Sequence, residues 1–563
     1  MGDAPGPADE DRLVREEEEK KSWWSRLNPW ELVLWVQLLA HHFEDYGGYR
    51  LLTLLVVAQW IVKGLVYGYV AASMEWVFRD LGVPGPQLQI YKSVAMMPWS
   101  MKPIFGIASD CYPIFGYKRG PYIAIASAVG VSGHYMLGFQ PLDLTGVVIC
   151  LLFCEVQIAM VDLLTEARYA EAMRGKPDRG PDLVSFVWGG IMLGNLLALL
   201  TVSYIIENYG ARTVFVVALV PASLIFIPTI LNYIGDKPVP PEEAAQRRAF
   251  LWNEQPELLT LVAIMTVGTI FMIVVGLTSG NVWINLAVAL TVGFLVIFAI
   301  AMLTRPEIGA TNSFFCIQAM MAISIEGATF YFFTDTREQY PEGPHFSIWF
   351  YTSVTGIVAS IFGLIGMALY TQYGKNLRYR PLIVITNLIW CVLNLVCILV
   401  YTRDNVRLGI PDELFIMSST VLHAVVHQWM YLPGIVLLSQ QCPKGLEALM
   451  YALIASSHNL GHSVSNYIGA ALLVYLGVTP DGSRNESAKF KNLWIAALVQ
   501  ALLPAVTLIL AQWLVPNALQ TERLITKHVT SATAGSPYQQ CTGQVPIDEG
   551  DSEYGTFSGR SQS

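Results

Sequence analysis

Long apolar segments, separated by short polar ones, occupy most of the chain between residues 51 and 515. Each segment is about 18 residues or longer, which is enough for an α-helix to cross the apolar core of a bilayer. The pattern predicts fourteen membrane-spanning helices. They are Leu51–Tyr69, Ile90–Ala108, Tyr122–Phe139, Thr145–Tyr169, Leu183–Ile206, Val214–Ile234, Leu258–Leu277, Val282–Leu303, Ser313–Thr334, Ile348–Tyr373, Leu382–Tyr401, Leu414–Gln440, Ala448–Leu476 and Leu493–Val515.

The seventh and eighth predicted helices differ from the others. From Leu258 to Thr304 the sequence contains no Asp, Glu, Lys or Arg, whereas helices that line a water-filled path usually carry such residues. We therefore expect an inserted hairpin at the periphery, residues 258–304. It follows a six-helix bundle at 47–235 and a cytoplasmic linker at 236–257, and it precedes a second six-helix bundle at 305–516.

The two ends of the chain are polar. Residues 1–22 are highly charged and residues 517–563 are rich in Ser, Gly and Thr, so both are predicted to be disordered cytoplasmic tails. Residues 23–46 combine several tryptophans with an apolar run that is too short to span. This segment predicts a helix that lies on the membrane surface. The polar N-terminus does not match a cleavable signal peptide.

The two predicted six-helix bundles share a pattern of Gly and Pro. Gly106 and Pro121 are separated by the same interval as Gly366 and Pro381, and each interval contains basic residues and follows the second helix of its bundle. Two weakly similar halves are typical of transporters built from repeats. The expected fold class is therefore an all-α polytopic membrane protein made of two related bundles.

The composition agrees with a membrane protein and disfavours other classes. Hydrophobic residues make up 54% of the chain and charged residues only 14%, whereas about 25% of a soluble domain is charged. No basic tract indicates nucleic-acid binding. The eight cysteines form no CxxC pair, so they predict neither a metal centre nor a disulfide framework. No cofactor is expected.

The distribution of bases predicts the orientation in the membrane. Lys118, Arg119, Lys375 and other bases fall in alternate loops, which the positive-inside rule places in the cytoplasm. We expect both termini in the cytoplasm and the protein in the plasma membrane, as a monomer. The sequon Asn485-Glu486-Ser487 falls in the last outer loop, so Asn485 is a glycosylation candidate.

Two segments carry a resemblance to a known family. KPIFGIASDCYPIFGYKRGPY at 102–122 and VDLLTEARYAEAM at 161–173 resemble the folate-biopterin transporter family of the major facilitator superfamily. They look closest to the pteridine and folate carriers of trypanosomatid protozoa. The resemblance implies a major facilitator fold and import of folate or biopterin by alternating access. The same family contains S-adenosylmethionine carriers, so S-adenosylmethionine or a nucleoside-like molecule is the alternative cargo.

The first of these segments is predicted to be a gate rather than a substrate site, because it lies at the cytoplasmic end of the second helix. Asp110 can accept hydrogen bonds from bases or from a helix N-terminus of the opposite half. Lys118 and Arg119 can pair with acids such as Glu166. The gating candidates are Gly106, Asp110, Gly116, Lys118, Arg119, Glu166 and Arg168.

Charged residues inside the predicted helices need a partner or a water-filled cavity. Glu155, Asp162 and Glu166 form an acidic stripe on one face of the fourth helix, because they are seven and four residues apart. We expect Glu155 and Asp162 to line a cavity, and Glu166 and Arg168 to belong to an ion-pair network that holds helices together; a network with Lys63, Lys102 or Arg168 is the alternative for the whole stripe. Glu326 in the second half mirrors Lys63 in the first, so we expect both to flank a central cavity with the acidic stripe.

This cavity suits a polar aromatic solute. A carboxylate can accept two hydrogen bonds from the amidine-like edge of a pterin, and lysines suit the carboxylates of folate. Lys92, nearer a membrane edge, either snorkels or takes part. Aromatic side chains can stack on the ring, although they are also common as packing residues. The substrate-binding candidates are Lys63, Lys92, Glu155, Asp162, Glu326, Tyr331 and Trp349.

Two histidine pairs recur at helical spacing, His423 with His427 and His458 with His462. Such a pair can bind zinc, but the sequence offers no third ligand nearby, so no metal is expected. Because His titrates near neutral pH, the four residues are candidates for proton coupling in a symporter. A membrane enzyme that uses these pairs is disfavoured, because no acid lies at a close spacing.

Overall fold

The computed structural model describes residues 44, 48–175, 180–441, 447–522 and 531–543. This part of the chain is mainly helical, and twelve helices are long and apolar enough to cross a membrane. Two of the fourteen predicted helices are not among the twelve. One is divided into three short helices at 85–111, and the other, Glu447–Tyr475, carries many polar side chains. The predicted all-α polytopic fold class is confirmed.

The first half contains six helical passages. They are α3 (Gly48–Leu55) with η3 (Val56–Val66) and α4 (Tyr67–Asp80); α5 (Gly85–Met96) with η4 (Met97–Met101) and α6 (Lys102–Cys111); α7 (Gly120–Phe139); α8 (Leu144–Gly175); α9 (Gly180–Tyr209); and α10 (Thr213–Ser223) with α11 (Phe226–Ile230). The linker helix α12 (Pro241–Glu254) leads to the hairpin of α13 (Pro256–Thr278) and α14 (Val282–Leu303).

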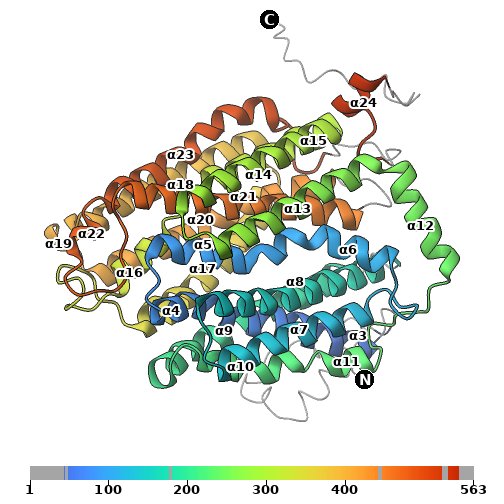
Figure 1. The fold of residues 1–563 in the computed structure, drawn as a ribbon. Helices are drawn as coiled ribbons and strands as arrows, with labels where there is room; N and C mark the ends of the chain where they lie inside the picture. The colour runs from blue at the N-terminus through green and yellow to red at the C-terminus, as the bar shows by residue number, and fades with distance from the viewer. Residues whose placement is uncertain (1–43, 45–47, 176–179, 442–446, 523–530, 544–563) are drawn as a thin grey trace, which may run out of the picture.

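The second half repeats the six passages. They are α15 (Pro306–Met321) with α16 (Glu326–Thr334); η6 (Trp349–Val354) with α17 (Thr355–Leu369) and η7 (Tyr370–Gly374); α18 (Tyr379–Tyr401); α20 (Asp412–Gln440); α21 (Glu447–Tyr475); and α23 (Leu493–Leu514). Short helices outside the passages are α19 (Asp404–Arg407), α22 (Ser487–Phe490) and α24 (Pro537–Thr542). Figure 1 shows α12 at one end of the bundle and α22 at the other. We call these the α12 end and the α22 end.

One buried side chain binds the free backbone groups at the break in an interrupted helix. The break between α15 and α16 at residues 322–325 leaves backbone groups without helical partners, which an apolar environment tolerates only if other groups bind them. Gln89 of α5 donates to the carbonyl oxygens of Ser324 at 3.1 Å and Asn466 at 2.6 Å. It accepts from the backbone N–H of Gly327 at 3.2 Å. A side chain of one half thus satisfies the backbone of the other.

Glycines let the first helix approach α9 closely. A Cβ atom at Gly194 would lie 2.1 Å from the carbonyl oxygen of Trp60. Such close contact between small residues is a common way to hold helices together in a membrane. The indole N–H of Trp60 also donates to the carbonyl oxygen of Phe186 at 3.0 Å, which fixes η3 against α9.

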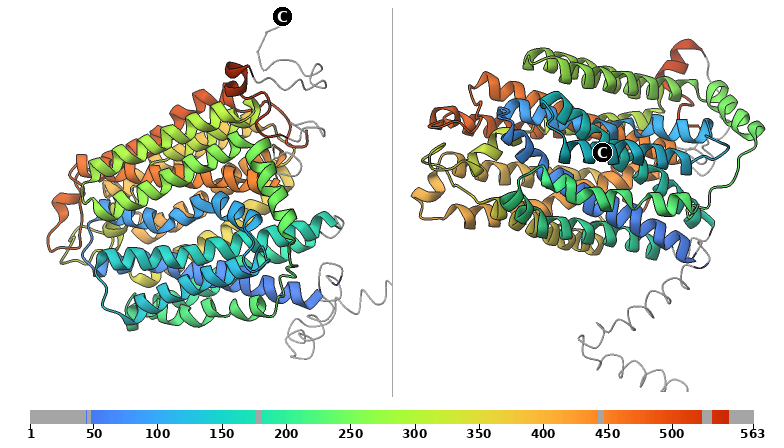
Figure 2. Two further views of the ribbon diagram at one scale, coloured as in Figure 1. Left: turned by 45° about the vertical axis from the view of Figure 1, so that its right-hand side comes forward. Right: turned by 60° about the horizontal axis from the view of Figure 1, so that its bottom comes forward.

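The inserted hairpin lies along the edge of the bundle, as the right-hand view of Figure 2 shows. Helix α13 packs on the second passage of the first half, and α14 packs on α15 and α21 of the second half. Val267, Phe271, Phe294 and Phe298 on this hairpin are each more than half exposed. Their apolar surface suits contact with lipid.

The segment after α23 departs from its predicted disorder. Gln520 is buried, and its Nε2 donates to the carbonyl oxygen of Gly374 at 2.8 Å. Gln539 donates to Oε1 of Glu257 at 2.8 Å. These bonds fasten parts of the predicted tail to the α12 end, so residues 517–563 are not disordered throughout. The predicted tail at 1–22 and, apart from Glu44, the predicted surface helix at 23–46 lie outside the described residues.

We expect Gly327→Ala to loosen the packing of α16 on α5. The added Cβ would lie 1.9 Å from the carbonyl oxygen of Gly85, so the helices must separate at a cost of about 1–3 kcal/mol. The apparent melting temperature of the detergent-purified protein should fall by several degrees. Gly280→Ala is the matched control, because nothing lies within 4 Å of its Cβ position. Equal melting temperatures for the two variants would contradict this account.

Candidate functional site

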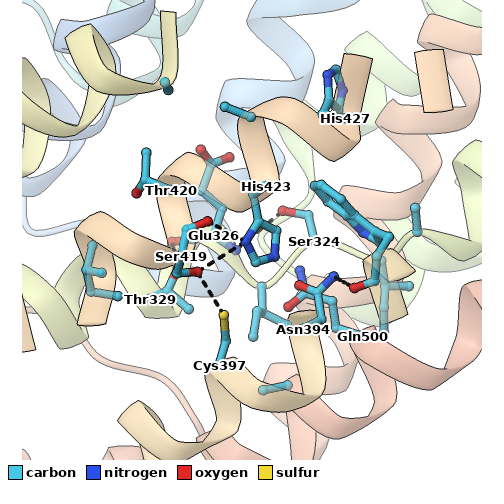
Figure 3. A pocket seen from close by; sticks show the side chains of 18 of the residues that line it. Ser324, Glu326, Thr329, Asn394, Cys397, Ser419, Thr420, His423, His427 and Gln500 are labelled. Atoms are coloured by element: carbon cyan, nitrogen blue, oxygen red, sulfur yellow. Dashed lines mark hydrogen bonds between the residues drawn. The ribbon is translucent and has the colours of Figure 1, made fainter. Parts of the chain in front are cut away.

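A cavity of about 740 Å³ lies among the helices of the second half. Figure 3 shows side chains from α16, α18, α20 and α23 around it. Its lining is rich in groups that donate or accept hydrogen bonds, which is uncommon in an apolar bundle and marks a place for a polar ligand. The polar lining residues are Ser324, Glu326, Thr329, Asn394, Ser419, Thr420, His423, His427, Gln428, His462, Ser465, Asn466 and Gln500.

A second cavity of about 410 Å³ lies between the halves. Glu75, Lys92 and Asn195 of the first half line it together with Tyr351 of the second. Four residues line both cavities: Glu326, Phe333, Ile416 and Thr420. The two cavities therefore meet at Glu326, at the start of α16.

Lys92 lies between two carboxylates at this meeting point. Its Nζ is 2.8 Å from Oε1 of Glu75 and 2.8 Å from Oε1 of Glu326. We call these three residues the acid-rich cluster. Because Glu326 belongs to the second half, the cluster joins the two halves, and the Glu326 side chain stays 47% exposed. Lys92 does not snorkel to a membrane edge, which was one of its two predicted alternatives.

Glu75 is a site residue that the sequence analysis missed. The hydropathy pattern ends the first predicted helix at Tyr69, whereas α4 continues to Asp80. The available signal was Lys92, because a lysine inside a membrane helix requires an acidic partner. The identity of that partner depends on how the first two passages pack, which the sequence does not specify.

Asp162 of α8 binds two lysines. Its Oδ1 lies 2.7 Å from Nζ of Lys63, and its Oδ2 lies 2.7 Å from Nζ of Lys102. We call these three residues the base-rich cluster. The predicted alternative of an ion-pair network with Lys63 and Lys102 describes Asp162 well. Lys63 and Glu326 belong to different clusters, and the two cavities that Glu326 lines do not include Lys63.

The other charged residues of α8 have further hydrogen-bond partners. Glu155 is buried and accepts from the indole N–H of Trp99 at 2.8 Å. Glu166 hydrogen-bonds Tyr169. Arg168 donates through Nε to the carbonyl oxygen of Ile234 at 2.7 Å. Glu166 also interacts electrostatically with Asp162 and its two lysines, so only Glu155 of the predicted stripe has a separate partner.

The two predicted aromatic contacts lie outside both cavities. Tyr331 is fully buried, and its hydroxyl donates to the carbonyl oxygen of Val83 at 2.6 Å. Trp349 is 44% exposed, and its backbone N–H donates to Oε1 of Glu207 at 3.2 Å. These residues join the halves near the α22 end, whereas Phe333 is an aromatic residue that lines both cavities.

Three of the four predicted histidines line the larger cavity. His423, His427 and His462 are part of its wall, and the ring of His458 lies beside His462 with centroids 4.7 Å apart. Nδ1 of His423 lies 2.8 Å from the carbonyl oxygen of Ser419, which orients the imidazole toward the cavity (Figure 3). Among the described residues no cluster of three His, Cys, Asp or Glu could hold a metal ion.

Polar contacts join the two halves at the α22 end. Arg79 at the end of α4 donates to Oγ1 of Thr334 at 2.5 Å, to Oδ1 of Asp335 at 3.0 Å and to Oε1 of Gln339 at 2.9 Å. The indole N–H of Trp76 donates to a threonine hydroxyl of η6 at 3.0 Å. One side chain of the first half thus binds three residues of the second.

Asp335, one of the three residues that Arg79 binds, has a raised pKa. The residue is fully buried in the loop after α16. Burial, together with the neighbouring Glu486 carboxylate, raises the pKa of Asp335 to about 9, although Arg79 opposes the shift. This shift favours the protonated carboxyl group of Asp335, against the ion pair that its Oδ1 forms with Arg79 at 3.0 Å.

The predicted gate segment lies at the α12 end, but its partners differ from those expected. Asp110 lies 3.6 Å from Arg247 of the linker helix α12 rather than against the opposite half. Lys118 binds Glu243 of α12 at 3.0 Å, and Arg119 forms an ion pair with Glu171. The suggested pairing of these bases with Glu166 is wrong.

The glycines of this segment have unequal surroundings. Gly116 has a φ of +83° in the turn before α7, which only glycine adopts easily, and its carbonyl oxygen accepts from the Val239 N–H at 2.8 Å. Gly106 lies beside Leu163 of α8, whose side chain would be 3.9 Å from an added Cβ. Asn485 is exposed in the loop before α22, and its glycosylation stays a prediction.

Two six-passage halves with a cavity between them form a fold that solved membrane transporters share. Among solved structures, the chain is similar to a POT peptide transporter in complex with sulfate, with a TM-score of 0.57, 18% identity and coverage of 82% of this chain and 95% of that one. It is also similar to the nucleoside transporter NupG, with a TM-score of 0.55, 12% identity and coverage of 82% and 99%. At these identities the likeness shows the fold alone.

The sequence matches the model of the BT1 family over residues 63–533, and the chain belongs to this family. It is 24% identical over 454 residues to the folate-biopterin transporter of Synechocystis sp., covering 80% of this chain and 78% of that protein. It is 22% identical to folate transporter 2 of Plasmodium falciparum, covering 81% and 87%. The predicted family is confirmed, and the protein is a transporter rather than an enzyme.

The raised pKa of Asp335 fixes the sign of a pH dependence. An unfolded Asp loses its proton near pH ~4, whereas folded Asp335 keeps it to about pH 9. Its contribution to stability is therefore complete at low pH and is lost as the pH rises through this window. We expect Asp335→Asn, which has no proton to lose, to flatten the decline of apparent melting temperature from about pH 5 to pH 9. Glu338→Gln, an exposed acid nearby, should leave the curve unchanged, and parallel curves for all three proteins would disprove the assignment.

Proposed function

We propose that the chain imports folates and pterins by alternating access between its two halves. The observation that carries the proposal is the position of Glu326, where the two cavities meet and the halves share the acid-rich cluster. The names of relatives in the same family, folate-biopterin transporter and folate transporter, support the choice of cargo.

The chemistry of the larger cavity suits a pterin ring. The edge of the ring presents adjacent N–H donors, which the exposed carboxylate of Glu326 can accept in a bidentate manner. The amide side chains of Asn394, Asn466 and Gln500 offer both donors and acceptors for its remaining polar atoms. The ring faces find flat partners in Phe333 and in the histidines of α20.

The contacts at the α22 end support a state that opens toward the α12 end. Alternating access requires one end to be sealed while the cargo enters or leaves by the other, and the contacts of Arg79 provide such a seal. Lys118, Arg119 and Lys375 favour a cytoplasmic α12 end by the positive-inside rule. This orientation puts Asn485 outside and both termini inside, in a monomer of the plasma membrane.

Proton coupling would follow from the acid-rich cluster. Two carboxylates share one ammonium there, so one negative charge has no basic partner within the cluster. A proton on Glu75 or Glu326 would neutralise it during transport through an apolar bundle. The cavity histidines His423 and His462 are further places where that proton can rest.

The same charge excess favours a second candidate cargo. A cation such as S-adenosylmethionine could neutralise the acid-rich cluster instead of a proton. Competition between labelled folate and unlabelled S-adenosylmethionine separates the two candidates. Strong inhibition by S-adenosylmethionine together with its own accumulation would favour the cationic cargo.

We expect Glu326→Gln and Lys92→Gln to lower uptake of labelled folate and biopterin about tenfold or more, because each removes a charge-assisted contact at the meeting point of the cavities. Uptake is measured in transport-deficient cells that express the full chain. Glu413→Gln, an exposed acid at the start of α20, is the control and should keep normal uptake. If the wild-type chain reaches the membrane and accumulates neither compound, the proposed function is wrong.

A further inference from the structure

The acid-rich and base-rich clusters have opposite ratios of acidic to basic side chains. The first places two carboxylates on one ammonium, and the second places two ammonium groups on one carboxylate. Glu166 hydrogen-bonds Tyr169 and also interacts electrostatically with Lys63 and Lys102, so it supplies a countercharge beside the base-rich cluster. Excess charge of one sign in an apolar bundle is costly unless a ligand or a countercharge can approach it.

The two clusters lie on the same two passages of the first half. Glu75 and Lys63 are twelve residues apart on the first passage, and Lys92 and Lys102 are ten residues apart on the second. At about 1.5 Å per residue these intervals correspond to about 18 and about 15 Å along the bundle. The base-rich cluster is therefore displaced from Glu326 toward the α12 end.

An aromatic strip connects the clusters. The rings of Tyr67 and Trp99 meet edge to face with centroids 5.7 Å apart. Tyr67 interacts electrostatically with Lys92 of the acid-rich cluster, and Nζ of Lys102 lies 4.4 Å from the centroid of the Trp99 ring. A flat spacer could therefore lie against aromatic faces on its way from one cluster to the other.

Lys63 is the most exposed member of the base-rich cluster. The side chain of Lys63 is 18% exposed, and its Nζ lies 5.3 Å from the centroid of the Trp188 ring. Trp188 is 42% exposed. Across from it, Tyr431 of α20 is 41% exposed and interacts electrostatically with Lys63. The Lys63 side chain is thus only partly covered, and its ammonium group is bound to Asp162.

We propose that Lys63 and Lys102 bind the anionic tail of the transported molecule while its ring lies against Glu326, an inference that rests on the proposed function. The layout fits a donor-rich heterocycle, an aromatic spacer and carboxylates in line, as in folate. Biopterin has the ring without the carboxylates, so it does not need the base-rich cluster. The two lysines therefore determine the preference for folates over unconjugated pterins.

The test compares the uptake of labelled folate and biopterin by the full chain. Lys63→Gln leaves Asp162 paired with Lys102, so the substitution does not orphan a buried carboxylate. We expect the ratio of folate to biopterin uptake to fall about tenfold, because the variant loses one charge-assisted contact with folate. The change should appear in the KM for folate. Lys63→Arg keeps the charge and should restore the ratio.

Two further variants keep the test decisive. Lys102→Gln should lower the ratio in the same direction and replaces Lys63→Gln if that variant does not reach the membrane. Lys237→Gln removes an exposed lysine near the α12 end and should keep the wild-type ratio. An unchanged ratio in both glutamine variants, or equal loss of both compounds, overturns the inference. A wild-type chain that carries biopterin but not folate overturns it too and leaves the proposed function standing, whereas a chain that carries neither overturns the proposed function itself.

Discussion

The structure depends on the need to pair every charge that lies inside an apolar bundle. Lys92 shows this most clearly, because its ammonium contacts Glu75 of its own half and Glu326 of the other at 2.8 Å each. Either carboxylate left alone in this environment would be costly. The pairing therefore brings the first passages of both halves together at one point, and the two cavities meet there.

The interrupted helices follow from the same shortage of polar partners. A continuous helix satisfies its own backbone, but a break exposes N–H and C=O groups that only a side chain or another backbone can bind. Gln89 supplies these bonds across the halves. The break directly before Glu326 frees that carboxylate from a regular helical surface and lets it face both cavities. The site thus lies where the bonds of Gln89 allow a helix to be interrupted.

Hydropathy alone predicted the number and order of the passages, because apolar length is a local property of the sequence. It also identified Glu326 and Asp162, since a charge within an apolar run stands out. It could not assign their partners: Lys63 belongs with Asp162 and Lys92 with Glu326, and the choice depends on packing between distant segments. Glu75 was missed because it follows the apolar window. Tyr331 was assigned to the substrate site because the sequence does not show which face of its helix is buried.

The hairpin of α13 and α14 connects to both halves and therefore has to accommodate any rotation of one half against the other. Where Gly268 packs on Val292, the seam between its helices is apolar. The hydroxyls of Thr266 and Thr291 bond to carbonyl oxygens of their own helices. Asn285 donates to the carbonyl oxygen of Ser279 at 3.0 Å, which fastens the start of α14 to the turn between the two helices. Among the described residues, apolar side-chain contacts thus couple the two halves through this hairpin.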